Sequence, residues 1–272
     1  MLNSLHNIPC EEGIQLLKDK GFLVDMICCS PPYNVNLGDN KYNKKPYDLY
    51  KDNKDHKEYI NWLTTIFSDC QSILKEGATV CINIGDGKNG SVPTHSDIIQ
   101  FMSKQLEYVP VTTIIWDKGN CSNRTSWGSW LSPSNPSFPT PFEYILVFRY
   151  KDRHHNGNKE DITVLKDEYI TNSLALWRFG TEKLSKVGHP AAFPLELPKR
   201  CIQQLTYKGD TVVDIFSGSG TTAMAAKGLG RQYIGFELSA QYHDLASQRI
   251  ETINEGELLS VETATTFSAK LF

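Results

Sequence analysis

Residues 211–222 read TVVDIFSGSGTT, an apolar run followed by a glycine turn and two threonines. The run up to Phe216 has the length and character of a buried strand, and the segment from Thr221 to Leu229 has that of a helix. Glycines between a strand and a helix let the backbone approach a ligand at the carboxyl edge of a parallel sheet. This stretch therefore predicts a ligand-binding turn in an α/β fold.

The sequence after this turn narrows the class of ligand. Glu237 ends the next apolar run, about twenty residues on, where an acidic side chain in Rossmann-like sheets accepts hydrogen bonds from ribose hydroxyls. No GK[ST] follows Gly220, which argues against a Walker loop, and the third glycine of a dinucleotide fingerprint is missing near Thr222. A nucleoside cofactor without a pyrophosphate is favoured over NAD. The alternative to ligand binding is a structural role: Glu237 as a solvated residue at a strand end, and Asp214 as a cap on the glycine turn.

The rest of the chain alternates strands with helices. Alternation of this kind favours a largely parallel sheet covered by helices, and the strand 143–148, which follows a long loop, has the option of pairing antiparallel. We expect helices at 11–20, 58–74, 95–105, 194–205, 221–229 and 240–255, and strands at 23–29, 78–84, 111–116, 143–148, 211–216 and 232–238.

A second motif, Ser30-Pro31-Pro32-Tyr33, directly follows the first predicted strand. Two prolines fix φ and remove two donors, so the segment is a rigid ledge of acceptors. The exocyclic amine of cytosine or adenine is a poor nucleophile because its lone pair is delocalised into the ring. Acceptors aimed at both N–H bonds, from Ser30 Oγ and the Pro31 carbonyl, favour a tetrahedral nitrogen, and Tyr33 is placed to stack on a flipped-out base. The alternative is a proline-terminated strand with a packing tyrosine.

Together and in this order, the two motifs resemble the beta-class DNA amino-methyltransferases of restriction-modification systems. In that family a (D/N/S)PP(Y/F) segment precedes the target-recognition region and the cofactor motif comes last. The resemblance rests on SPPYNVN at 30–36, EYILVF at 143–148, HPAAFP at 189–194 and GDTVVDIFSGSGTTAMAAKGLGRQYIGFELSAQY at 209–242. Two departures are Ile215, where the family usually has proline, and Pro141-Phe142, where histidine is common.

The resemblance implies a site and a cofactor. The fold would be a Rossmann-like S-adenosylmethionine-dependent methyltransferase with a mostly parallel sheet, helices on both faces, a circularly permuted motif order and a small recognition insertion. The catalytic residues would be Ser30, Pro31, Pro32 and Tyr33. S-adenosyl-L-methionine would contact Asp214, Phe216, Ser217, Gly218, Gly220, Thr221, Thr222, Glu237, His189, Pro190, Ala191 and Phe193.

The methylated atom depends chiefly on Ser30. In this family a leading serine usually accompanies cytosine N4 and a leading aspartate adenine N6. We therefore expect a site-specific cytosine-N4 methyltransferase acting on double-stranded DNA by base flipping. Adenine N6 is the first alternative, and methylation of a protein amide, for which related NPPY ledges serve, is a more remote one. A non-catalytic DNA-binding module would not need both Glu237 and the ledge.

Basic side chains flank the ledge and the strand 143–148, although the net charge is −3. Local positive charge binds phosphates even on an acidic protein. Ordinary solvated loops with packing tryptophans are the alternative for any one residue. The candidate DNA-binding residues are Lys41, Lys44, Lys45, Lys118, Arg124, Trp127, Arg149 and Arg153.

The amino-acid composition argues against a fibrous, disordered or membrane protein. Hydrophobic residues make up 40% of the chain and charged residues 22%, close to the average of globular domains. No secretion signal or membrane-spanning run is apparent, and the cysteines have no CxxC spacing, so we expect a cytoplasmic protein with reduced thiols and no metal. The resemblance adds double-stranded DNA, an independently acting cognate endonuclease and a homodimer as partners.

The predicted organisation is one catalytic domain with an insertion. Residues 1–148 form its catalytic half, with a mobile loop at 35–57. Residues 149–188 form the target-recognition insertion, 189–255 the cofactor-binding half and 256–272 a loosely held tail.

Overall fold

The structure is a computed structural model, and it describes residues 1–36, 47, 49–119, 132–136, 138–182 and 193–260. Residues 37–46 and 48 of the predicted loop 35–57, and residues 261–272 of the predicted tail, lie outside these residues. None of the described helices combines the length and apolar character needed to cross a membrane.

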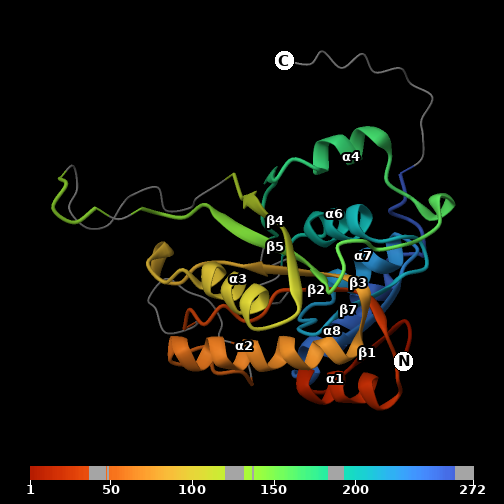
Figure 1. The fold of residues 1–272 in the computed structure, drawn as a ribbon, viewed down its shortest axis with the longest axis horizontal. Helices are drawn as coiled ribbons and strands as arrows, with labels where there is room; N and C mark the ends of the chain where they lie inside the picture. Colours follow the sequence, from red (N-terminus) through yellow and green to blue (C-terminus); the bar gives the residue numbers. More distant parts are fainter. Residues whose placement is uncertain (37–46, 48, 120–131, 137, 183–192, 261–272) are drawn as a thin grey trace.

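An eight-stranded sheet forms the centre of the described chain, in the order β1-β8-β7-β2-β3-β5-β4-β6 (Figure 1). Neighbouring strands are parallel except where β5 pairs antiparallel with β3 and with β4. The mostly parallel sheet and the antiparallel option for residues 143–148 are therefore confirmed. The strands are β1 (Ser4–His6), β2 (Val24–Cys29), β3 (Leu74–Ile84), β4 (Tyr108–Asp117), β5 (Phe142–Tyr150), β6 (Leu176–Arg178), β7 (Thr211–Asp214) and β8 (Gln232–Phe236).

Helices cover both faces of the sheet (Figure 1). One face packs against α1 (Cys10–Asp19), α2 (His56–Cys70) and α3 (Thr94–Lys104). The other packs against α6 (Glu196–Leu205), α7 (Thr221–Gly228) and the end of α8 (Ala240–Glu251), with α4 (Lys166–Asn172) against α6. Single 3₁₀ turns lie at Gln71–Ile73, Lys88–Gly90 and Lys159–Asp161.

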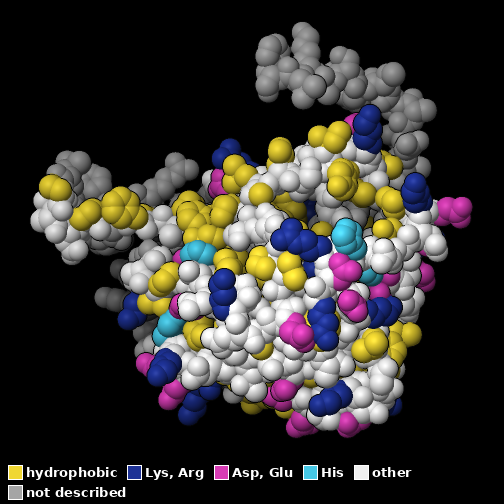
Figure 2. Space-filling model, in the orientation of Figure 1, with side chains coloured by type: hydrophobic (Ala, Val, Ile, Leu, Met, Phe, Trp, Pro, Cys, Tyr) yellow, Lys and Arg dark blue, Asp and Glu magenta, His cyan; other side chains and the backbone are white. Residues whose placement is uncertain are grey.

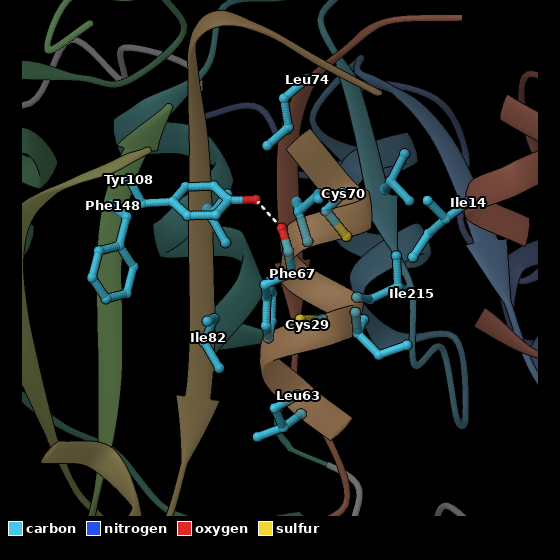
Figure 3. Close-up of a cluster of buried hydrophobic side chains, with 14 of the residues drawn as sticks. Ile14, Cys29, Leu63, Phe67, Cys70, Leu74, Ile82, Tyr108, Phe148 and Ile215 are labelled. Carbon is cyan, nitrogen blue, oxygen red and sulfur yellow. Dashed lines mark hydrogen bonds between the residues drawn. The ribbon is translucent and has the colours of Figure 1, made fainter. Parts of the chain in front are cut away.

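The core on the α1–α3 face is built from apolar positions at helical spacing on α2 packed against alternating strand positions (Figure 3). Leu63 and Phe67 are fully buried there against Ile82 and Phe148. The Tyr108 hydroxyl donates to the Phe67 carbonyl over 2.7 Å, so a polar group in this core has its partner. The six described cysteines are buried and unpaired, as expected for reduced thiols.

Two short strands were not predicted. β1 and β6 have three residues each, too few for a period-2 pattern to be recognised. β6 lies within the predicted insertion 149–188 but pairs with β4 at the edge of the sheet, through Trp116 opposite Trp177. Part of that segment is therefore continuous with the sheet.

Candidate active site

The two sequence motifs meet because their strands are neighbours. β2 and β7 pair in parallel, with Met26 opposite Val212 and Ile27 opposite Val213. Both strands end at the same edge of the sheet, so the residues that follow them converge there. A cavity at this edge is lined by the ledge from Ser30 to Tyr33, by the glycine turn from Ile215 to Ser219 and by Glu237.

The ledge is held in place by hydrogen bonds from two elements. The Tyr59 hydroxyl of α2 donates to the Pro32 carbonyl over 2.7 Å. Beyond the ledge, the backbone amides of Asn34 and Val35 donate to the buried carboxylate of Asp52 at 2.8 and 3.1 Å. The Pro32 carbonyl is already engaged by Tyr59. The Ser30 hydroxyl and the Pro31 carbonyl therefore remain as the acceptors that the sequence predicted for an amine.

Behind the ledge lies a polar cluster that we call the Glu143 cluster: Ser30, Tyr33, Asn83, Lys118 and Glu143. The Tyr33 hydroxyl donates to Glu143 Oε2 over 2.8 Å. Asn83 Nδ2 donates to the Tyr33 oxygen over 2.6 Å and to Glu143 Oε2 over 2.9 Å. Lys118 Nζ pairs with Glu143 Oε1. Ser30 Oγ lies 3.2 Å from the Tyr33 oxygen and 3.1 Å from the Asn83 carbonyl. Burial, followed by the nearby Glu143 carboxylate, raises the pKa of Tyr33 well above its usual value, so its phenol keeps its proton.

The glycine turn is shaped by two left-handed glycines. Gly218 has φ +50° and Gly220 has φ +75°, which non-glycine residues rarely adopt. The Gly218 amide donates to Glu237 Oε2 over 2.7 Å, and Glu237 Oε1 accepts from the Ser239 amide over 2.9 Å. Glu237 thus joins the end of β8 to the turn, at the rim of the cavity.

Asp214 lies beneath the turn and is 2% exposed. Its Oδ1 accepts from the Phe216 amide over 3.0 Å, while its Oδ2 is buried with no hydrogen-bond partner among the described residues. Burial is the main reason that the pKa of this carboxyl is raised to about 7. Asp214 does not line the cavity, so its part in the site is to hold the turn through the Phe216 amide.

The predicted cofactor residues separate into three groups. Phe193, Phe216, Ser217, Gly218, Thr221 and Glu237 line the cavity. Asp214, Gly220 and Thr222 support the turn from behind it: a Cβ at Gly220 would lie 2.8 Å from that of Ala246, and the buried Thr222 hydroxyl donates to the Cys28 carbonyl over 3.3 Å. His189, Pro190 and Ala191 lie outside the described residues.

Sequence reasoning missed the wall contributed by α1 and α2. Glu11 at the start of α1 accepts a hydrogen bond from Trp62 Nε1 of α2 over 3.0 Å, and both residues line the cavity. The Trp62 ring packs against that of Phe216 with centroids 5.7 Å apart. Recognising β1 would have identified Glu11, because β1 pairs with β8 and its following residues reach the same edge.

The candidate DNA-binding residues do not form one group in the described chain. Lys118 follows β4 at the edge that carries the cavity, but its ammonium group is paired with Glu143. Arg149 is opposite Thr79, toward the other edge, and donates to the Gly77 carbonyl and the Thr79 hydroxyl. Arg149 is therefore engaged in the packing of the sheet, and its assignment to DNA binding stays a prediction. Arg153 follows it at the same far edge. The remaining candidates, Lys41, Lys44, Lys45, Arg124 and Trp127, lie outside the described residues.

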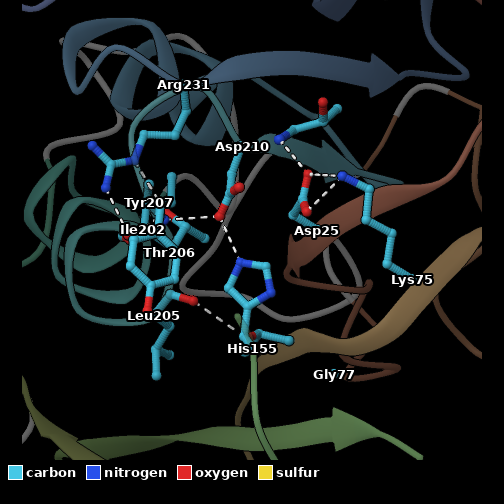
Figure 4. A network of polar contacts seen from close by, with 12 residues as sticks. Asp25, Lys75, Gly77, His155, Ile202, Leu205, Thr206, Tyr207, Asp210 and Arg231 are labelled. Carbon is cyan, nitrogen blue, oxygen red and sulfur yellow. Dashed lines mark hydrogen bonds and ion pairs between the residues drawn. The ribbon is translucent and has the colours of Figure 1, made fainter. Parts of the chain in front are cut away.

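A second polar network lies at the opposite edge of the sheet (Figure 4). Asp25 accepts from Lys75 Nζ at 2.8 and 2.9 Å and from the Thr211 amide at 2.9 Å. His155 Nε2 lies 2.7 Å from Asp210 Oδ2, which also accepts from the Tyr207 amide. His155 is therefore anchored to the core through Asp210. Asp25, His155 and Asp210 lie close enough to share a metal ion, but each already has a hydrogen-bond partner in the protein.

Figure 2 shows one face of the molecule, with hydrophobic side chains gathered over the region of α4. Lys and Arg side chains on this face are scattered among Asp and Glu, so the coloured part of this view contains no basic patch. Exposed large apolar residues in and beside the predicted insertion are Ile162, Tyr169, Ile170, Leu174 and Leu176.

Comparison with known proteins identifies the family of the chain. A family model described as DNA methylase, N6_N4_Mtase, matches residues 24–248. The type II methyltransferase M.MjaVI of Methanocaldococcus jannaschii is 33% identical over 161 residues, 58% of this chain and 78% of the relative. The type II methyltransferase M.MthZI of Methanothermobacter thermautotrophicus is 30% identical over 260 residues, 86% of this chain and 72% of the relative.

A solved structure has the same fold. TTHA0409 of Thermus thermophilus, named as a candidate DNA modification methylase and crystallised with S-adenosyl-L-methionine, superposes with a TM-score of 0.66. The alignment has 23% identity and covers 92% of this chain and 93% of that one. The family model runs from β2 through the ledge and the glycine turn to α8. As the resemblance to beta-class amino-methyltransferases predicted, the chain belongs to the N6_N4_Mtase family of DNA methylases.

Proposed function

We infer that this DNA methylase transfers the methyl group of S-adenosylmethionine to N4 of a flipped-out cytosine in double-stranded DNA, as the modification enzyme of a restriction-modification system. The observation that carries the proposal is the cavity bounded by the Ser30 ledge on one side and the glycine turn on the other. An acceptor of methyl groups and a nucleoside cofactor need to meet in one enclosed space, and these two motifs supply one wall each.

The residues present fit S-adenosylmethionine. Glu237 stands at the end of β8, where ribose hydroxyls are bound in Rossmann-like sheets. The Phe216 and Trp62 rings supply an apolar wall of the cavity. When bound, this cofactor supplies an electrophilic methyl group on a sulfonium. Pro190 and the other cofactor candidates at 189–191 stay predictions.

The ledge supplies the acceptors for the amine. Ser30 Oγ and the Pro31 carbonyl would receive the two N–H bonds of the target, which returns the nitrogen lone pair toward the methyl group. The Tyr33 hydroxyl is engaged behind the ledge, so its contribution to the cavity is its ring. Prolines at 31 and 32 keep the ledge rigid, so little reorganisation is needed during transfer.

The choice of cytosine rests on Ser30. A neutral hydroxyl presents a smaller acceptor than a carboxylate, which suits cytosine N4, whereas adenine N6 is the alternative that the same geometry serves. The long segment 149–188 supports a role in reading the DNA site, although β6 ties part of it to the sheet. A cognate endonuclease and a homodimer are further parts of the proposal.

The test is mass spectrometry of nucleosides from unmethylated genomic DNA incubated with the protein and S-adenosylmethionine. N4-methylcytosine is the expected product. N6-methyladenine would keep the mechanism but overturn the interpretation of Ser30. If neither forms while the cofactor binds, DNA is not the substrate under these conditions, and a protein amide becomes the next substrate to assay.

A further inference from the structure

The Glu143 cluster contains a chain of hydrogen bonds with a fixed direction. An ionised carboxylate accepts hydrogen bonds and donates none. Glu143 is ion-paired to Lys118, so the Tyr33 hydroxyl, 2.8 Å from Glu143 Oε2, must be the donor in that contact. The Tyr33 oxygen is then left with its lone pairs, one of which receives Asn83 Nδ2 at 2.6 Å.

The remaining lone pair of Tyr33 determines what Ser30 does. Ser30 Oγ lies 3.2 Å from the Tyr33 oxygen, and the Asn83 carbonyl lies 3.1 Å from Ser30 Oγ. Both neighbours accept from Ser30 Oγ: the Tyr33 oxygen because its own proton is committed to Glu143, and the Asn83 backbone carbonyl because a carbonyl oxygen can only accept. With its proton held inside the cluster, Ser30 presents its own lone pairs to the cavity. A hydroxyl free to rotate would present its proton there for part of the time and would repel an approaching N–H bond.

We propose that Glu143 is a positioning residue for methyl transfer: through Tyr33 it keeps Ser30 as an acceptor toward the target amine, and it receives the proton that the amine must lose. The inference rests on the proposed function, because it concerns the same amine. It assigns a role to the first residue of the 143–148 strand that the sequence motif alone does not indicate.

The proton transfer balances along this chain. As the new N–C bond forms and the S–C bond breaks, the sulfonium becomes a neutral thioether and the nitrogen carries one proton too many. That proton passes to Ser30 Oγ, the Ser30 proton passes to the Tyr33 oxygen, and the Tyr33 proton passes to Glu143 Oε2. The products are a neutral methylated amine and a protonated Glu143, which returns its proton to water. Its side chain is 13% exposed, so water has access.

The contacts around Glu143 suit this task better than a purely structural one. Its two oxygens are divided between partners, with Oε1 paired to Lys118 and Oε2 facing Tyr33 and Asn83. The Asn83 amide holds Tyr33 and Glu143 together, and Asn83 Oδ1 is itself buried without a hydrogen-bond partner in the described residues. The cluster has therefore not been optimised for polar satisfaction alone.

The test compares Glu143→Gln with wild type in single-turnover methylation of DNA with saturating cofactor. Glutamine keeps the size of the side chain but presents an NH₂ group that donates to Tyr33. This substitution reverses the direction of the hydrogen bonds from Ser30 through Tyr33 to residue 143. We expect the rate of methyl transfer to fall at least about tenfold, as for loss of proton-transfer assistance. The KM for DNA and the Kd for S-adenosylmethionine should stay within about twofold, because neither ligand touches Glu143 in this scheme.

A double-mutant cycle with Tyr33→Phe separates this role from packing. Phenylalanine removes the oxygen that links Ser30 to Glu143, so the double variant should be no slower than the slower single variant. Additive losses would overturn the proposal, as would a rate for Glu143→Gln within about threefold of wild type. If Glu143→Gln fails to fold, Tyr33→Phe alone must show the selective loss of rate with unchanged ligand affinities.

The matched control is Glu107→Gln. Glu107 is an exposed glutamate whose carboxylate lies 3.5 Å from Lys151 Nζ, and this variant should methylate at the wild-type rate. Failure of the underlying function is recognised separately, because wild type would then yield no methylated nucleoside. Wild-type activity with an unaffected Glu143→Gln variant would overturn this inference alone.

Discussion

The two ends of strand β2 carry polar groups of opposite character. Near its start, the Asp25 carboxylate is 3% exposed and has partners in Lys75 and the Thr211 amide. At the edge beyond its other end, Asp214 Oδ2 and Asn83 Oδ1 are buried without hydrogen-bond partners in the described residues. A buried polar atom left unpaired costs about 1–3 kcal/mol.

This contrast shows where the fold gives up stability. The amino edge satisfies its charged groups with one another and fixes the start of segment 149–188 through His155. The carboxyl edge leaves acceptors unpaired behind the residues that line the cavity, a cost in stability that proteins tolerate near functional sites. Substitutions at the two edges should therefore have opposite consequences for stability and activity.

The largest expected effect is on the pH dependence of stability, in Asp214→Asn. Folding raises the Asp214 pKa from 3.8 to about 7, so the folded state binds this proton more tightly than the unfolded chain. Its contribution to stability is complete below about pH 4 and is lost as pH rises through 7. Asparagine has no such loss, so at pH 8 the variant should be more stable by on the order of 4 kcal/mol.

Urea unfolding of cofactor-free wild type and Asp214→Asn at pH 4, 6 and 8 measures this difference. The gap should be small at pH 4 and widen with pH. A gap that stays constant would mean that the Asp214 carboxyl is not protonated preferentially in the folded state.

The next largest effect is on catalysis, in Ser30→Ala. Loss of an acceptor for the amine should reduce the methyl-transfer rate about 100-fold or more, close to 3 kcal/mol, while cofactor affinity changes little. Single-turnover rates and isothermal titration with S-adenosylmethionine measure the two quantities. Ser72→Ala, which removes an exposed hydroxyl outside the cavity, is the control and should retain wild-type values. A rate for Ser30→Ala within about threefold of wild type would refute the assignment of the ledge.

Glu237→Ala should show the reverse pattern. The carboxylate accepts from two backbone amides and stands at the predicted ribose position, so its removal should weaken cofactor binding about 10- to 100-fold. The rate at saturating cofactor should change less than the affinity. Equal losses in both quantities would indicate that Glu237 acts on the reacting groups as well.

The smallest effect belongs to the amino edge, in Asp25→Asn. The amide oxygen still accepts from Thr211, and the half-exposed Lys75 returns to water, so we expect a loss of about 1 kcal/mol in unfolding free energy. The methylation rate per folded molecule should not change. Thermal unfolding and single-turnover assays test this, and a selective loss of activity would show that the two edges are coupled.

Sequence patterns predicted the alternating order of the longer elements and both motifs of the site. The Pro-Pro ledge and the glycine turn are local features, because φ at proline and the left-handed conformation at glycine depend on the residue itself. Apolar runs of strand length likewise predicted β2, β3, β5 and β7. β1 and β6 were not predicted because strands of three residues show no recognisable period. Without β1, the cavity wall that contains Glu11 was not predicted either.

The sequence by itself determined an α/β fold with a glycine turn and a Pro-Pro ledge, which we propose to bind the nucleoside cofactor and the target amine. Only the tertiary structure decided that these meet, because the pairing of β2 with β7 joins segments far apart in the chain. It also determined the contacts of single charged residues. Arg149 hydrogen-bonds within the sheet, Lys118 pairs with Glu143, and Glu143 accepts from Tyr33. Such outcomes depend on strand order and register, which bring together side chains whose spacing in the sequence carries no periodic signal.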